Sequence, residues 1–222
     1  MIENKLSFFF KNQIWHIGSL LFLFYLGNQI VDFENNLNVF FGISVKNWFL
    51  FSMTTPLLHQ GYVWLCWRSE LCWKTISTTI GFKAYAVIFI IIMISRLFSI
   101  GLCFADYSSW FNPGWIAWTI SVLIFIPFIY TIYSIKKYFG FMRATGIDHF
   151  DPNYKNIPFE KRGIFKWSSN AMYTFATVVF FGFAISAGSK AMFVFAAYTY
   201  IGGWLHYFCT EKEDFKVIYG NS

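Results

Sequence analysis

The chain has 222 residues, of which 57% are hydrophobic, 24% are aromatic and only 13% are charged. Soluble domains carry about 25% charged residues, so this composition excludes an ordinary soluble protein and favours an integral membrane protein. The formal net charge of +6 comes from basic residues that interrupt apolar stretches. That placement argues against a nucleic-acid-binding domain and predicts contact with anionic lipid headgroups.

Six apolar stretches follow one another, each near the roughly 20 residues that a helix needs to cross a membrane. Only Gly188, Ser189 and Lys190 separate the last two stretches, and such a break suits a tight helical hairpin. We therefore predict an all-α membrane protein of about six transmembrane helices, forming a single domain over residues 1–222. Residues 1–135 form its four-helix part and residues 136–222 its second part. The expected spans cover residues 13–31, 47–67, 84–104, 114–135, 170–187 and 191–207.

The basic residues indicate how these spans are oriented. With this assignment, every Lys and Arg except Lys46, Arg96 and Lys190 falls on the side of the two termini. The positive-inside rule therefore predicts a multi-pass protein with both termini in the cytoplasm. Both a bacterial inner membrane and the endoplasmic reticulum agree with this orientation. No sequence feature indicates an oligomeric state.

Residues 136–166 form the longest polar connection and alternate aromatic with basic residues. This pattern is typical of an element that lies on the membrane surface, so we expect chemistry near the cytoplasmic face. No G-x-G-x-x-G follows a strand pattern, so a cofactor site must be built from helices. The cysteines lack metal-ligand spacing, which predicts a packing role and no metal site; they are Cys66, Cys72, Cys103 and Cys209.

Several short motifs occur in order towards the end of the chain. Residues 210–220 read T-E-K-E-D-F-K-V-I-Y-G, where acidic and basic residues arrive as the last apolar stretch ends. Upstream, residues 162–165 read R-G-I-F and residues 169–173 read S-N-A-M-Y. Further blocks are Y-F-G-F-M-R-A at 138–144, G-I-D-H-F at 146–150 and H-Q-G-Y-V-W at 59–64.

These motifs resemble the phospholipid N-methyltransferase family, which is related to the isoprenylcysteine carboxyl methyltransferases. The family's tail is close to T-E-K-P-D followed by I-Y-G, and its upstream signature is R-(H or N)-P-x-Y. In this chain Glu213 replaces the proline of the tail, while Ser169 and Ala171 replace the arginine and proline of the signature. The resemblance is strongest over residues 138–220. It implies S-adenosylmethionine-dependent N-methylation of phosphatidylethanolamine, or of its mono- and dimethyl derivatives, at the cytoplasmic membrane face.

The chemistry of S-adenosylmethionine indicates which residues would bind it. The cofactor carries a sulfonium, an ammonium, a carboxylate and an adenine, so its pocket needs an acidic group, hydrogen-bond donors and an aromatic or apolar slot. Asn170, Tyr173, His206 and Glu211 supply these groups near one membrane depth, and Asn170 opens the fifth span, where free backbone N–H groups favour a carboxylate. The resemblance adds Gly140 as a cofactor glycine.

Methyl transfer needs mainly positioning, but the ammonium of a phosphatidylethanolamine headgroup must lose a proton before it attacks. Asp148, His149 and Glu211 are the candidate bases, and the sequence does not rank them.

Each candidate also has a structural interpretation. Asn170 is equally suited to cap a helix, and Tyr173 could belong to an interfacial aromatic belt. Gly140 could simply break a helix, and Glu211 could be part of a solvated tail.

Arg96 interrupts an otherwise apolar span, where a charge costs about 2.5–3.5 kcal/mol, so a functional role is the default. Its alternatives are snorkelling or pairing with Asp106. His59 and Gln60 also interrupt a span, and simple bonding across helices is an alternative for both.

Two other functions stay open from the sequence. A methyltransferase of the same fold and cofactor could act on an isoprenylcysteine carboxylate or on a small thiol. A transporter or a non-enzymatic membrane protein would also place polar residues in its spans, although the chain shows no internal repeat.

Overall fold

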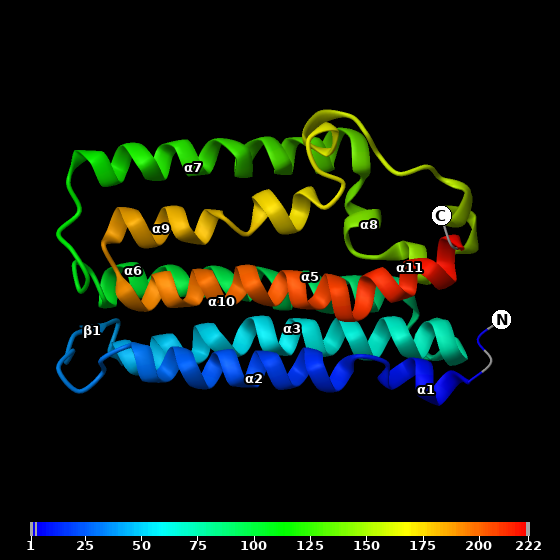
Figure 1. Ribbon diagram of the computed structural model, residues 1–222, viewed down its shortest axis with the longest axis horizontal. Coiled ribbons are helices and arrows are strands. Elements are labelled where there is room, and N and C mark those ends of the chain that lie inside the picture. The colour runs from blue at the N-terminus through cyan, green and yellow to red at the C-terminus, as the bar shows by residue number, and fades with distance from the viewer. Residues whose placement is uncertain (1, 3, 221–222) are drawn as a thin grey trace.

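The computed structural model describes residues 2 and 4–220, and it is mostly helical, as predicted (Figure 1). Two short strands pair antiparallel between the second and third helices, with Phe40 opposite Ile43; they are β1 (Val39–Phe40) and β2 (Ile43–Ser44). The α-helices are α1 (Lys5–Phe10), α2 (Gln13–Ile30), α3 (Val45–Trp73), α4 (Thr75–Thr79), α5 (Gly81–Ser95), α6 (Ile100–Ala105), α7 (Trp115–Ser134), α8 (Phe141–Ala144), α9 (Val179–Ala187), α10 (Lys190–His206) and α11 (Lys212–Tyr219).

Two helical rods are long and apolar enough to cross a membrane. One joins α5 to α6 through the 3-10 turn Arg96–Ser99 and covers Gly81–Ala105, and the other extends α7 through Phe139. Both have 25 residues, with mean hydropathies of 2.5 and 2.0, and most of their surface is not covered by the rest of the protein. These rods match the third and fourth expected spans. The other four expected spans stay predictions.

Helix α10 is the centre of the bundle, because it packs against α9 on one side and against α2 and α3 on the other (Figure 1). The main apolar core lies along this line and includes Leu20, Phe49, Met53, Leu102 and Phe195, all fully buried. Helices α1 and α11 lie at one end of the bundle, and the β1–β2 turn lies at the other. The two ends of the described chain are therefore on the same side.

Helices α9 and α10 form the expected hairpin, and glycine is required at its turn. Gly188 has φ +58°, and a Cβ at this position would collide with the carbonyl of Phe111. A further contact joins this hairpin to α7: the Ser121 hydroxyl of α7 donates to the Gly182 carbonyl of α9 at 2.8 Å. The hairpin therefore places residues near 173 and residues near 211 at one end of the bundle.

Asp106 anchors the hairpin turn at the opposite end. Its Oδ2 accepts hydrogen bonds from the hydroxyls of Ser109 and Ser189, each at 2.7 Å, and from the Ala191 N–H at 2.8 Å. The alternative pairing of Arg96 with Asp106 is wrong, because Arg96 instead contacts His59. Asp106 is 1% exposed, so its carboxylate has little access to water. The hydroxyl and backbone donors replace the hydrogen bonds that water would give.

We expect Asp106→Ala to lower the free energy of unfolding by about 1–3 kcal/mol, because buried donors lose their acceptor. Thermal unfolding in detergent measures the loss. Asp32→Ala is the matched control, since the Asp32 carboxylate is exposed and bonds only within its own loop. Equal melting temperatures for the two variants would contradict this role of Asp106.

Candidate functional site

Tyr173 and Glu211 meet at the end of the bundle that carries α11. The Tyr173 hydroxyl donates a hydrogen bond to Glu211 Oε2, although the two residues come from separate sequence motifs. Tyr173 lies in a π-helical turn, Met172–Ala176, and Glu211 ends another, Tyr207–Glu211, which continues α10. π-helical turns often occur at functional sites because they redirect side chains. The rings of Trp204 and Tyr207 lie 6.1 and 5.8 Å from that of Tyr173.

Burial changes the acidity of Glu211. The side chain is 8% exposed, and the pKa of its carboxyl is raised from 4.5 to about 7, mainly by desolvation. The hydrogen bond from Tyr173 opposes this rise, and the charges of Asp214 and Asp148 contribute to it. Near neutral pH the group therefore exchanges a proton readily and, once ionised, attracts a cation. Glu211 Oε1 accepts no hydrogen bond from the described residues.

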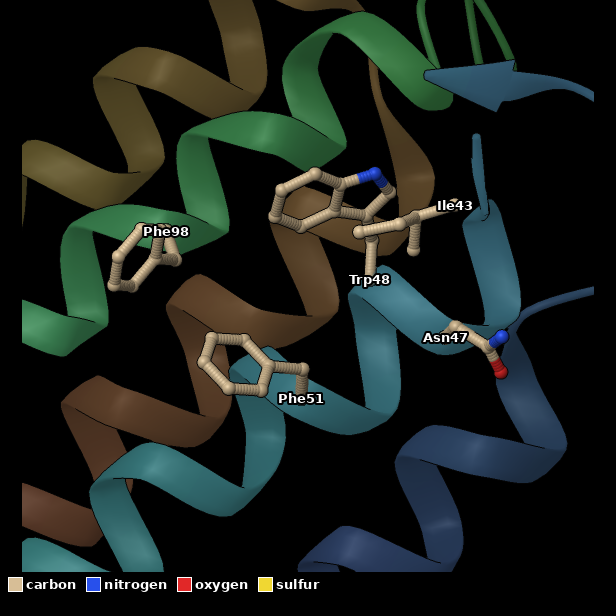
Figure 2. A pocket seen from close by; sticks show the side chains of 5 residues that line it. All are labelled: Ile43, Asn47, Trp48, Phe51 and Phe98. Atoms are coloured by element: carbon tan, nitrogen blue, oxygen red, sulfur yellow. The ribbon is translucent and has the colours of Figure 1, made fainter. Parts of the chain in front are cut away.

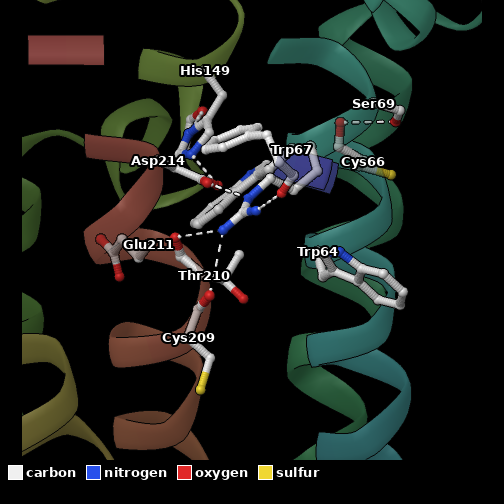
Figure 3. A network of polar contacts seen from close by, with 12 residues as sticks. Trp64, Cys66, Trp67, Ser69, His149, Cys209, Thr210, Glu211 and Asp214 are labelled. Atoms are coloured by element: carbon white, nitrogen blue, oxygen red, sulfur yellow. Dashed lines mark hydrogen bonds and ion pairs between the residues drawn. The ribbon is translucent and has the colours of Figure 1, made fainter. Parts of the chain in front are cut away.

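A buried ion pair ties this end of the chain to the N-terminal part. Arg68, near the end of α3, pairs with Asp214 of α11, and both side chains are 0% exposed. The Arg68 guanidinium also donates to the carbonyls of Phe8, Cys209 and Thr210. Figure 3 shows this network, with Thr210 and Asp214 on one side and α3 on the other.

His149 is held in the same network. Its Nε2 lies 3.4 Å from Asp214 Oδ2, and its ring stacks on Trp67 with centroids 3.9 Å apart (Figure 3). The expected surface segment over residues 136–166 therefore folds back onto the helix ends at this point. Its function as a membrane-surface element stays a prediction.

One oxygen of Asp148 is already paired, while its buried Oδ1 has no hydrogen-bond partner among the described residues. The Tyr219 hydroxyl donates to its Oδ2, and Arg143 Nε lies 3.3 Å from the same oxygen. Burial and the adjacent Asp148 raise the pKa of Tyr219 to about 12. Arg143 also donates to the carbonyls of Ile157 and Pro158, so it fixes the loop that follows. These contacts suit a structural role for Asp148 better than that of a free base.

Polar side chains of α2 and α3 extend the site into the bundle. His16 Nε2 lies 2.8 Å from Gln60 Oε1, so Gln60 does bond across helices. The His16 ring lies 5.3 Å from that of His206, and Gln13 reaches Thr210 Oγ1 at 3.1 Å. His206 Nδ1 is buried and has no hydrogen-bond partner among the described residues. A ligand that accepts or donates a hydrogen bond there would satisfy it.

The structure thus brings Tyr173, His206 and Glu211 into one region, with His149 and Asp148 beside it. Gly140 and Asn170 make none of these contacts. Gly140 ends the second long rod with φ +90° and ψ 135°, so it breaks the helix. The Asn170 side chain makes no hydrogen bond in the described part of the chain, and the helix start there has no side-chain cap.

The sequence did not single out Arg68, Arg143, His16 or Trp67 for the site. A charged residue near the end of an apolar helix was the only available signal for Arg68. Within residues 2 and 4–220, no group of three or more His, Cys, Asp or Glu residues is placed to hold a metal ion.

One open surface pocket lies elsewhere. It has a volume of about 500 Å³ and lies near β2 at the opposite end of the bundle (Figure 2). Its lining is mostly apolar and includes no candidate site residue; it consists of Ile43, Asn47, Trp48, Phe51 and Phe98. The contact between Tyr173 and Glu211 is not part of this pocket.

The fold and the site define a helical protein with two membrane-length apolar rods and a buried acidic and aromatic cluster at one end. Residues 116–222 match the family model of phospholipid methyltransferases. This match assigns the C-terminal half of the chain to that family and confirms the resemblance seen in the motifs. It indicates a methyltransferase with a lipid substrate and, with the two rods, association with a membrane. Comparisons with curated proteins and with solved structures gave no match.

The raised pKa of Glu211 has a consequence for stability. The folded carboxyl keeps its proton up to about pH 7, whereas the unfolded one loses it near pH 4.5, so the folded state binds more protons between these values. Raising the pH from about 5 to about 8 should therefore destabilise the wild-type protein by about 2–3 kcal/mol more than Glu211→Gln. Melting temperatures of both proteins across this range measure the effect. Parallel pH curves would contradict it.

Proposed function

We propose that this protein transfers a methyl group from S-adenosylmethionine to the amine of phosphatidylethanolamine or of its mono- and dimethyl derivatives. The observation that carries the proposal is the partly buried contact between Tyr173 and Glu211, which joins two motifs of the family-matched segment. We also propose six membrane spans with both termini in the cytoplasm. The shared side of α1 and α11 supports this topology, and under it the proposed site faces the cytoplasm.

The residues around Glu211 fit the chemical groups of the cofactor. An ionised Glu211 offers Oε1 to a cation, and the aromatic rings of Tyr173, Trp204 and Tyr207 provide faces that attract positive charge. His206 Nδ1 provides one more buried polar contact. When bound, S-adenosylmethionine supplies a methyl group that its sulfonium already activates. The protein therefore has to orient donor and acceptor and exclude water.

Among the three candidate bases, the contacts favour Glu211. Asp148 is engaged by Tyr219 and Arg143, and His149 faces Asp214. Glu211 combines a free oxygen with a pKa of about 7, which suits a group that takes a proton from an ammonium near neutral pH. Tyr173 acts as its positioning residue, because its hydroxyl fixes the other oxygen.

We expect Glu211→Gln to weaken equilibrium binding of labelled S-adenosylmethionine by about ten-fold or more, because a charged partner is lost, and Tyr173→Phe to weaken it less. Matched controls are Glu213→Gln, whose carboxylate pairs with Lys11 and Lys216, and Tyr200→Phe in α10. Near-normal affinity in Glu211→Gln, with the variant folded in detergent, would remove the site assignment.

The reaction itself is tested with purified protein in liposomes of phosphatidylethanolamine and its mono- and dimethyl derivatives. We expect the radiolabelled methyl group to appear in a lipid with a methylated headgroup, and the lipid that gains label shows which step is catalysed. Cofactor binding without labelled lipid would redirect the search to isoprenylcysteine carboxylates and small thiols. If the protein neither binds the cofactor nor transfers a methyl group, the proposed function is wrong.

A further inference from the structure

Arg96 is a cation deep in the bundle without an anion. It begins the 3-10 turn that joins α5 to α6, and its Nη2 lies 2.8 Å from His59 Nδ1 of α3. None of the ion pairs among the described residues includes Arg96. Its Nε is buried and has no hydrogen-bond partner. A charge in an apolar span is expensive unless something compensates for it.

The contact with His59 does not compensate for this charge. A guanidinium has only donors, so His59 Nδ1 must accept the bond, and the proton of the neutral ring is then on Nε2. That Nε2 is buried as well, and no acceptor reaches it from the described residues. Arg96 and His59 therefore present two N–H donors and one positive charge, all still without an acceptor.

Other polar groups face the same region. The hydroxyl of Tyr198 is buried and unbonded, and Tyr198 and Tyr173 both lie within electrostatic range of Arg96. His206, with its unbonded Nδ1, is within range of Arg96 and His59. The unsatisfied atoms thus come from α3, from the 3-10 turn Arg96–Ser99 and from α10, and those outside the turn lie within electrostatic range of Arg96. A set of buried donors of this kind is typical of a binding site for anionic oxygen.

We propose that Arg96, oriented by His59, binds an anionic oxygen group of a ligand of this enzyme, either a carboxylate or a phosphodiester. The inference rests on the proposed function, whose two ligands supply these groups: the cofactor has a carboxylate and the lipid a phosphodiester. Both ligands also carry a cation. Tyr173 contacts Glu211, which attracts the cationic end, and lies within electrostatic range of Arg96, which attracts the anionic end.

This subsite lies outside the family-matched segment, because Arg96 and His59 precede residue 116. The N-terminal part of the chain would therefore contribute directly to ligand binding. Arg96 is a binding residue in this scheme, and His59 is a positioning residue.

The test compares two cofactor probes with Arg96→Gln. Decarboxylated S-adenosylmethionine keeps the sulfonium and the amine but lacks the carboxylate. If Arg96 binds the carboxylate, Arg96→Gln weakens the binding of S-adenosylmethionine by about ten-fold or more. The affinity for the decarboxylated probe then stays unchanged. Arg96→Lys should recover part of the loss, because it keeps the charge without the planar guanidinium. Lys83→Gln, which removes an exposed cation from the same helical rod, Gly81–Ala105, is the control.

The second arm uses the lipid. If Arg96 binds the phosphodiester, Arg96→Gln leaves the affinity for both cofactor probes unchanged and raises the KM for phosphatidylethanolamine about ten-fold or more. Unchanged values in both arms, or equal losses for the two cofactor probes, would overturn the proposal. Equal losses would mean that the variant disturbs the site without removing a carboxylate contact.

A measurement without ligand separates this proposal from the proposed function. Arg96→Leu removes an uncompensated cation, so we expect the ligand-free variant to melt at a higher temperature than the wild type. A lower melting temperature would mean that Arg96 serves the fold through His59 and would overturn the inference. If the wild type neither binds S-adenosylmethionine nor methylates lipid, the proposed function fails, whatever the result for Arg96→Leu.

Discussion

The ion pair between Arg68 and Asp214 is the interaction on which this end of the molecule depends. Both charges are completely covered, and removing one partner of such a pair costs about 3–5 kcal/mol because the other charge is left alone. The same guanidinium holds the carbonyls of Cys209 and Thr210, immediately before Glu211. The position of the acidic residue in the site is therefore set by a residue from the other half of the chain.

The sequence predicted those features that depend on local patterns. The helical hairpin followed from a three-residue break at Gly188, and the all-helical class followed from long apolar stretches. The motifs named Tyr173 and Glu211 separately, and hairpin geometry explains why they meet. The alternative role of Asn170 as a helix cap is wrong, because its side chain makes no cap hydrogen bond and the chain enters a π-helical turn there. Interrupted hydrogen bonding of this kind leaves no clear pattern in a single sequence.

The rest of the site depends on pairings between distant segments, which periodicity cannot reveal. Arg68 was interpreted only as one of several basic residues on the side of the termini, because nothing local indicates that Asp214 will reach it. Similarly, Arg96 had two structural interpretations, and its partner His59 was known only as a polar residue in another span. Apolar helices pack in many registers, so the choice of polar partners across them is a tertiary property.

Three π-helical turns, Ile135–Phe139, Met172–Ala176 and Tyr207–Glu211, lie in the part of the chain that builds the site. A π-helical turn holds one more residue than an α-helical turn, and one residue corresponds to about 100° of rotation around a helix axis. The angular phase of α11, and with it the direction of Asp214, therefore depends on a single extra residue within the turn that precedes it. In an alignment with a relative that lacks this turn, the one-residue gap belongs inside the helix at residues 207–211, not in a neighbouring loop.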